Sequence, residues 1–328
     1  AGVVFYIFVG IFSVTLVAQF WSFASDIYGV ERGKRLFPLV AIGASAGAVG
    51  GSWIGEQLLA TGINAYNLIL VSLLPLAAAI LFAVWTDRRE TGTGTAEPSR
   101  RFEPAAPNGE SPFRLIVQHR YLTATATMTV LFSWVVASGD NILFGFVQET
   151  LQQQIAGSDP AQHSKMINTA TTAFYGNLYF WINLVGLLLQ AFVVSRVLQY
   201  GGFGSLLLIT PLVSLAAYAS MLMTPVLAVV KVMKIAENSS NYSINNTARH
   251  VLWLPATKEM LYQAKPTVDT LCVRIGDGCA ALVVLIGTRF WSYSIVDFIA
   301  FNLGLIVLWL CVSSFLVFEH RRFSAQQA

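Results

Sequence analysis

A stripe of polar side chains runs along one face of the apolar segment that begins at Pro225. The stripe consists of Lys231, Lys234, Asn238, Asn241 and Asn245, which recur at spacings of three and four. Side chains at these spacings share one face of a helix. Because a lysine inside a membrane is costly unless it faces a cavity or a partner, the stripe is predicted to line an aqueous path.

The two lysines, backed by Glu237, suit a ligand that carries negative charge, such as a phosphate or a carboxylate. A second interpretation keeps the helix but shortens its membrane portion. Residues 237–249 would then form a solvated cytoplasmic extension, and the lysines would pair with acidic side chains of other spans.

Asp140 interrupts another apolar segment, SWVVASGDNILFGFVQE. A carboxylate at this place cannot face lipid, so we expect Asp140 to look into the helical bundle. It would serve as a counter-ion for Lys231 or Lys234, or as a carrier of coupling protons; a hydrated helix end is the alternative. The substrate-binding candidates are Asp140, Lys231, Lys234, Glu237, Asn238, Asn241 and Asn245.

The sequence lacks the motifs of the common catalytic and metal sites. It has no Gly-rich phosphate loop followed by Lys-Ser/Thr and no His-Glu-x-x-His, and its four histidines fall in loops or at span ends. Cys272, Cys279 and Cys311 lack the paired spacing of a zinc site and are expected to pack among apolar side chains. We therefore expect no enzyme activity, no cofactor and no metal ion.

The elements that carry these residues are predicted to be membrane-spanning helices. Of the 328 residues, 55% are apolar and 11% are charged, against about 45–50% and about 25% in soluble domains. Nine apolar runs approach the roughly 20 residues that cross a bilayer as helix. They lie at about 3–24, 36–59, 65–86, 121–147, 167–195, 203–223, 225–247, 272–290 and 295–318. The expected fold class is an all-α polytopic membrane protein in contact with the lipid bilayer.

The basic residues predict the orientation. Sixteen of the 20 Lys and Arg residues lie in one set of alternating loops, two lie in the opposite set and two lie inside a span. Cytoplasmic loops collect basic residues, so the first set, together with the C-terminus, is expected to be cytoplasmic. A net charge of +3 with this distribution gives no reason to expect a nucleic acid polymer as a partner.

The spans fall into two groups. Residues 87–120 begin with a stretch rich in Pro, Gly, Thr and charge, which predicts a flexible cytoplasmic linker. Three spans precede it in 1–86 and six follow it in 121–328. Two halves of six helices are the layout of major facilitator transporters. We therefore expect nine of twelve helices here, with 1–86 as the C-terminal part of the first helical half.

Two loops at equivalent positions in the halves, 26–35 and 257–278, carry charges of both signs. Ion pairs between them would latch one state of alternating access, and a solvated charge cluster is the alternative. The gating candidates are Arg35, Lys265, Asp269, Arg274 and Asp277. Arg274 and Asp277, three residues apart, are the expected buried pair.

One predicted helix carries a face of small residues. Gly43, Gly47, Gly51 and Gly55 are each four residues apart and therefore share one face. Such a pattern is typical of a tight seam between two helices.

Three stretches of the chain resemble the ATP/ADP translocase family of plastids and intracellular bacteria, and more closely its broader, major-facilitator-like bacterial branch. They are FWSFASDIYGVERGKRLFPLVAIG at 20–43, INLVGLLLQAFVVSRVLQYGGFGSLLLITP at 182–211 and NYSINNTARHVLWLPATKEMLYQAKPTVDTLCVRIGDG at 241–278. By resemblance, the motif positions of the last stretch are Tyr242, Ser243, Pro255, Lys265, Asp269, Arg274 and Gly276. The resemblance implies nucleotide exchange across a membrane, here expected to be a bacterial inner membrane.

The leading hypothesis is a secondary transporter of major-facilitator type that moves an anionic small-molecule solute by alternating access. A nucleotide such as ATP or ADP is the candidate that the resemblance adds. The alternative is a non-transporting membrane scaffold or sensor on the same fold, coupled to a partner domain outside this sequence.

Overall fold

The computed structural model forms helices over the long apolar runs of the sequence. It describes Phe8, Val9, Phe12, Leu16, Phe20 and residues 30–92, 111–155, 160–253, 255–257 and 260–327, with the backbone alone for 30–42. No strand occurs in these ranges. The all-helical class expected from the composition is confirmed for the described residues.

The N-terminal helices are α2 (Val30–Ala60), α3 (Ala65–Val71) and α4 (Leu73–Gly92). They are followed by α5 (Pro112–Gln118), α6 (Arg120–Ile155), α7 (Pro160–Leu188), α8 (Val194–Met223), α9 (Leu227–Ser240), α10 (Asn246–Leu252), α11 (Lys265–Thr267), α12 (Val273–Arg289) and α13 (Ile295–Gln327). Four π-helical turns join some of them: η1 (Leu189–Val193), η2 (Asn241–Asn245), η3 (Met260–Ala264) and η4 (Val268–Cys272). Such turns insert an extra residue into a helix and shift the faces of the residues that follow.

The chain forms two compact units. Unit 1 comprises Ala1–Gly47 and Gly62–Glu103, and unit 2 comprises Ala48–Thr61 and Pro104–Ala328. In unit 1, α3 and α4 follow one another, separated at Ser72, whose hydroxyl donates to the carbonyl of Ile69 at 2.7 Å. Gly62, at φ +89°, makes the turn between α2 and α3, a left-handed conformation that glycine adopts without strain.

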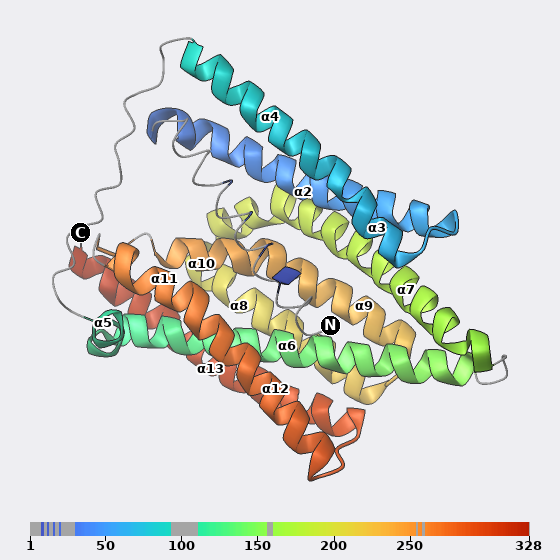
Figure 1. Ribbon diagram of the computed structural model, residues 1–328. Helices are drawn as coiled ribbons and strands as arrows, with labels where there is room; N and C mark the ends of the chain where they lie inside the picture. Colours follow the sequence, from blue (N-terminus) through green and yellow to red (C-terminus); the bar gives the residue numbers. More distant parts are fainter. Residues whose placement is uncertain are drawn as a thin grey trace. The chain divides into compact units, whose positions relative to one another are not determined.

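Unit 2 is built around α6, which packs along both α12 and α13 (Figure 1). Its core side chains include Leu122, Met128 and Val135 of α6 and Trp309 of α13, all fully buried. Helix α8 packs between α13 and α9, and α7 covers α9 from another side. Close packing of these buried apolar side chains stabilises the unit. The helices that take part are α6, α7, α8, α9, α12 and α13.

Helices α6 and α12 approach each other closely at Gly276. A Cβ atom at this position would lie 2.5 Å from the carbonyl oxygen of Val130 and 2.7 Å from the Cβ of Ser133. No side chain fits in so short a distance, so glycine is required where the two helices cross. The hydroxyl of Ser133 also donates to the carbonyl of Val273 at 3.0 Å.

One end of unit 2 is held together by Tyr121 at the start of α6. Its hydroxyl donates to the carbonyl of Leu252 at 2.5 Å and lies 2.9 Å from Nδ1 of His320. Its ring stacks on Phe323 with centroids 4.7 Å apart. The beginning of α6, the end of α10 and the end of α13 therefore meet at one end of the unit.

Five helical runs within the described ranges are long and apolar enough to cross a membrane. They are Asn67–Thr86, Arg120–Gln154, Ser164–Met223, Lys265–Arg289 and Ile295–Phe323. The run Ser164–Met223 is broken at Gly202, where φ is +69°, so it accommodates the two spans predicted at 167–195 and 203–223. Of the predicted span 225–247, residues 227–247 are helical, but Lys231, Lys234 and Glu237 lie close together there and lower the mean hydropathy below that of the five runs. The count of nine spans stays a prediction, and most of 3–24 lies outside the described residues.

The glycine face of α2 is not a tight seam among the described residues. A Cβ atom built at Gly43, Gly47, Gly51 or Gly55 would meet no described atom within 4 Å. Instead, the adjacent face contacts α7, where the amide of Asn183 donates to the hydroxyl of Ser52 at 3.0 Å. The four glycines share one face of α2 as predicted, but the contact with α7 is made by the neighbouring face that carries Ser52.

Candidate functional site

The polar stripe predicted on the segment after Pro225 lies inside unit 2. The buried side chains are those of Lys234, Glu237, Asn238, Asn241 and Asn245. Lys231 is half-buried. The interpretation of 237–249 as a solvated extension is therefore wrong for its polar face, because α7 and α8 pack around α9 and η2.

Lys234 is the most deeply buried charged residue of the stripe, with 1% of its side chain exposed. Its ammonium donates to Glu237 Oε2 at 2.8 Å, and it lies 3.3 Å from Asp140 Oδ1. Glu237 is as buried as Lys234, whereas 55% of the Asp140 side chain is exposed. Of the two lysines expected to pair with Asp140, Lys234 is the one that does so.

Gly139 makes room for this group beside α6. A Cβ atom at Gly139 would overlap the hydroxyl of Tyr218 and lie 2.9 Å from the ammonium of Lys234. The Tyr218 hydroxyl, Glu237 Oε1 and Asn302 Oδ1 are buried, and none has a hydrogen-bond partner among the described residues. The ion pair thus sits among polar atoms whose hydrogen-bonding capacity is not used, which is costly in a dry interior.

Lys231 has its own set of partners on α7. Its ammonium donates to Asn177 Oδ1 at 2.6 Å and lies 5.3 Å from the centre of the Phe174 ring. Asn177 in turn donates to Glu56 Oε1 of α2 at 2.7 Å. The amide therefore links the ammonium of Lys231 to a carboxylate.

The asparagines of the stripe are partly satisfied within η2. The amide of Asn245 donates to Asn241 Oδ1 at 3.0 Å, four residues earlier. The neighbouring hydroxyl of Ser239 donates across to the carbonyl of Ile182 on α7 at 3.0 Å. The first bond lies within the π-helical turn, and the second joins the end of α9 to α7.

Three tyrosines gather beside Asp140: Tyr242, which the family resemblance gives as a motif position, and Tyr175 and Tyr179, which the sequence did not single out. Tyr175 and Tyr179, one turn apart on α7, have ring centroids 6.1 Å apart at 29°. Tyr179 is 40% exposed and Tyr242 of η2 is 52% exposed. The hydroxyl of Tyr242 lies within electrostatic range of both Tyr179 and Asp140. The Tyr-x-x-x-Tyr spacing at 175–179 is the signal that would have found two of them.

Three of the predicted gating residues, Asp269, Arg274 and Asp277, take part in two local pairs. Arg249 of α10 donates to Asp269 Oδ1 at 2.8 Å, a bond that joins α10 to η4. Arg274 donates to Asp277 Oδ2 at 3.1 Å, but its side chain is 67% exposed. The prediction of a buried Arg274–Asp277 pair is therefore wrong on burial, because Gly276 rather than Arg274 faces α6. Asp277 also accepts a hydrogen bond from Ser133 at 2.7 Å.

The remaining gating candidates are not brought together among the described side chains. Lys265 is half-buried at the start of α11. Desolvation, and then the positive charge of Lys265, lower the pKa of His250. The side chain of Arg35 lies outside the described part of the chain.

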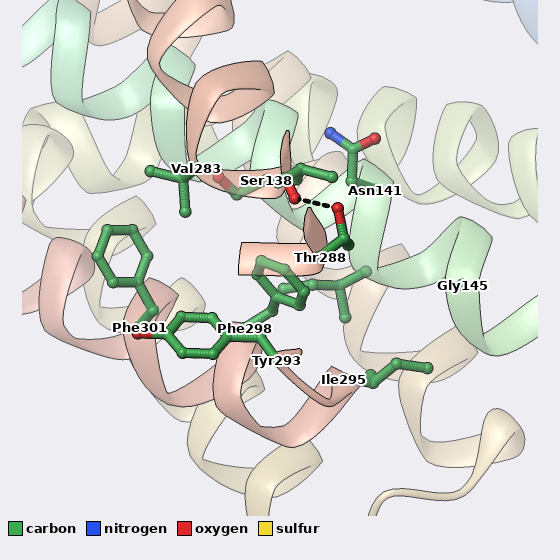
Figure 2. Close-up of a pocket in the computed structure, with 11 residues that line it drawn as sticks. Ser138, Asn141, Gly145, Val283, Thr288, Tyr293, Ile295, Phe298 and Phe301 are labelled. Carbon is green, nitrogen blue, oxygen red and sulfur yellow. Dashed lines mark hydrogen bonds between the residues drawn. The ribbon is translucent and has the colours of Figure 1, made fainter. Parts of the chain in front are cut away.

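A separate hollow of about 210 Å³ lies between α6, α12 and α13 (Figure 2). Its lining is mainly apolar and aromatic: Ile142, Gly145, Val283, Val284, Tyr293, Ile295, Phe298 and Phe301, with the polar residues Ser138, Asn141 and Thr288. No charged side chain lines it. It therefore differs in chemistry from the group around Lys234.

The arrangement around α9 suits the binding of charge more than covalent catalysis. Two ammonium groups, Lys231 and Lys234, face three carboxylates, Glu56, Asp140 and Glu237, two directly and one through Asn177. Among the described residues, no three His, Cys, Asp or Glu side chains lie close enough to hold a metal ion. An incoming anion would have to compete with a carboxylate for Lys234 and with the amide of Asn177 for Lys231.

A comparison with protein families assigns the chain. The family model described as "TLC ATP/ADP transporter" matches residues 2–320, nearly the whole sequence. The chain belongs to the TLC ATP/ADP transporter family. Together with the five apolar runs, this membership makes it an integral membrane protein.

The relatives of this TLC family member are named as ADP,ATP carriers or transporters. The chain is 22% identical to "ADP,ATP carrier protein 1" of Chlamydia trachomatis in an alignment of 307 residues, and the match covers 83% of this chain and 55% of that protein. It is 22% identical to "ADP,ATP carrier protein 2, chloroplastic" of Arabidopsis thaliana over 304 residues, and 24% identical to "Plastidic ATP/ADP-transporter" of Solanum tuberosum over 298 residues. These alignments cover 83% of this chain, and 46% and 45% of the two plant proteins. The chain spans about half the length of these relatives, and no solved structure matches it.

Proposed function

We propose that this chain is part of a secondary transporter of major-facilitator type that exchanges an anionic solute, a nucleotide such as ATP or ADP, by alternating access. Family membership and the names of the relatives support a nucleotide as the solute. In this proposal, residues 1–86 are the C-terminal part of the first helical half, 87–120 are the cytoplasmic linker and 121–328 are the second half. The membrane is a bacterial inner membrane with the C-terminus in the cytoplasm, and the protein transports its solute without chemical change.

The observation that carries the proposal is that the two carboxylate partners of Lys234, Glu237 and Asp140, differ in distance and in burial. Glu237 holds its ammonium at 2.8 Å from a fully buried position, while Asp140 lies at 3.3 Å and is largely exposed. An exposed carboxylate is not left as an uncompensated buried charge when it leaves an ion pair, so Asp140 is the partner that an incoming anion displaces. Glu237 then keeps Lys234 charged and oriented while the solute is bound.

Lys231 supplies a second positive charge one helical turn away on α9. Its bond to Asn177 is neutral, so the ammonium can turn toward an anion without separating a direct ion pair. A nucleotide carries several negative charges, and two lysines on one face provide point-charge partners for them. Asn238, Asn241 and Asn245 continue the same polar face beyond Lys234. In this proposal the face lines the solute path when the two halves move.

The local pairs at the other end of unit 2 are the proposed gate. Asp269 pairs with Arg249 and joins η4 to α10, whereas Asp277 pairs with Arg274 within α12. Arg35 and Lys265 are the proposed partners that meet when the cytoplasmic side closes. The exposed Arg274–Asp277 pair contributes little stability, which suits a contact that must open in every cycle, whereas the Arg249–Asp269 pair is half-buried.

The test is exchange of labelled ATP and ADP by the full-length protein in liposomes. We expect uptake that needs nucleotide on the opposite side and that falls at least tenfold in Lys231→Ala and Lys234→Ala. Lys165→Ala changes an exposed lysine of α7 and is the matched control. Absence of uptake, or uptake that is indifferent to both lysines, would overturn the proposal, and a folded protein without uptake would favour a scaffold or sensor.

A further inference from the structure

The tyrosines beside Asp140 are exposed although tyrosine rings have much apolar area to bury. Tyr179 and Tyr242 come from different helical segments, α7 and η2, and are 40% and 52% exposed. Tyr175 stacks behind Tyr179, and Phe174 meets Tyr175 edge-on with centroids 5.7 Å apart. The aromatic rings therefore support one another from one side and leave the other side open.

The exposed tyrosines lie beside a carboxylate. Asp140 lies within electrostatic range of Tyr175, Tyr179 and Tyr242, and more than half of its carboxylate side chain is exposed. An ionisable side chain in an apolar membrane segment faces a water-filled cavity or a protein partner, because lipid does not solvate it. Tyr179 and Tyr242, the two exposed tyrosines, therefore lie beside a group that water solvates and lipid does not.

The aromatic group is continuous with the positive charge of Lys231. Phe174, next to Tyr175 in sequence and in edge-on contact with it, lies 5.3 Å from the Lys231 ammonium. The aromatic side chains are thus followed by a positive charge. A ligand with a planar ring at one end and anionic groups at the other matches this arrangement. Stacking on tyrosine holds a heteroaromatic ring without reading its hydrogen-bonding edge.

We propose that Tyr175, Tyr179 and Tyr242 form a subsite for the base of a nucleotide, placed beside the lysines that bind its phosphates. This inference rests on the proposed function and adds the part of the solute that the lysines do not contact. Tyr179 and Tyr242 contact the base, and Tyr175 positions Tyr179 from behind. The hydroxyl groups are not required, because the ring faces carry the interaction.

Binding, measured separately from transport, tests the subsite. The purified full-length protein in nanodiscs is titrated with ATP, with adenosine and with inorganic tripolyphosphate, which has the charge of ATP but no base. We expect Tyr179→Leu and Tyr242→Leu each to weaken ATP binding about tenfold, the range found for loss of one base–aromatic stack. The same variants should leave tripolyphosphate binding unchanged, and adenosine should compete with ATP in the wild type alone.

Two controls separate stacking from general disruption. Tyr179→Phe and Tyr242→Phe keep the ring and should bind ATP as the wild type does. Tyr200→Leu removes a tyrosine that is 82% exposed elsewhere on α8 and should change neither ligand.

The outcomes distinguish this inference from the proposed function. Equal loss of ATP and tripolyphosphate binding in the leucine variants, or no competition by adenosine, overturns the base subsite even if lysine-dependent exchange is observed. Tyrosine-dependent ATP binding by a protein that transports nothing supports the subsite and overturns the transport proposal. A wild type that binds neither ligand overturns both.

Discussion

The ammonium of Lys234 and the carboxylate of Glu237 form a fully buried ion pair at 2.8 Å, one turn apart on α9. Helix geometry brings residues three apart onto one face, so this pair is formed within a single element. Asp140 is added to it from α6 only when the helices pack. The stability of unit 2 and the proposed anion exchange therefore depend on the same lysine.

Replacement of Glu237 by Gln should be strongly destabilising. It leaves Lys234 buried with Asp140 as its only charged partner in the described part of the chain, and loss of one member of a buried pair costs about 3–5 kcal/mol. Thermal unfolding of the detergent-solubilised full-length protein measures the effect. Asp277→Asn, which breaks an exposed pair and leaves the Ser133 acceptor in place, should cost less than about 1 kcal/mol. Equal melting temperatures for the two variants would contradict this assignment.

Asp140→Asn should increase the apparent affinity for an anionic nucleotide. The substitution removes the competing carboxylate while Glu237 continues to hold Lys234, so the anion no longer has to displace a charge. We expect KM for ATP exchange in liposomes to fall severalfold, with a smaller dependence on ionic strength. Glu149→Gln changes an exposed carboxylate nearer the end of α6 and should leave KM unaltered. A rise in KM for Asp140→Asn would refute the displacement step.

Gly139→Ala should disturb the site more than the fold. The added methyl group overlaps the Tyr218 hydroxyl and crowds the Lys234 ammonium, both of which are ends of side chains that can shift. Exchange activity should fall at least tenfold while the melting temperature changes little. Tyr218→Phe in the same protein removes the overlapping oxygen and should restore part of the activity. Gly145→Ala, whose methyl group would make ordinary contact with Ile295, is the control.

Gly276→Ala should instead separate two helices. Its Cβ would lie 2.5 Å from the Val130 carbonyl and 2.9 Å from the Trp134 amide nitrogen, and backbone atoms cannot move aside as side chains do. We expect a loss of about 1–3 kcal/mol, as for an overpacked core. At Gly278 a Cβ meets no described atom within 4 Å, so Gly278→Ala should be neutral or stabilising by up to about 1 kcal/mol. Similar unfolding curves for both variants would show that the close crossing is not required.

Local features of the sequence predicted much of this protein. Long apolar runs predicted the helices, because a backbone in lipid must satisfy its hydrogen bonds within the helix itself. The spacing of Lys231, Lys234 and Asn238 placed them on one face, since the period of a helix is set by bonds between residues four apart. The motifs at 20–43, 182–211 and 241–278 predicted the family that the comparison assigns.

The tertiary structure decided the partners. It joins Lys234 to Asp140 of α6, connects Lys231 through Asn177 to Glu56, and gathers tyrosines from α7 and η2 at one place. None of these contacts follows from spacing, because they depend on which helix faces meet and at what height they cross. The π-helical turn η2 changes the direction in which the residues after Ser240 point. The regular spacing of α9 therefore does not predict which way Tyr242 faces. The sequence by itself determined the helices and the charged face, and helix packing determined which charges are buried together and which remain accessible to a solute.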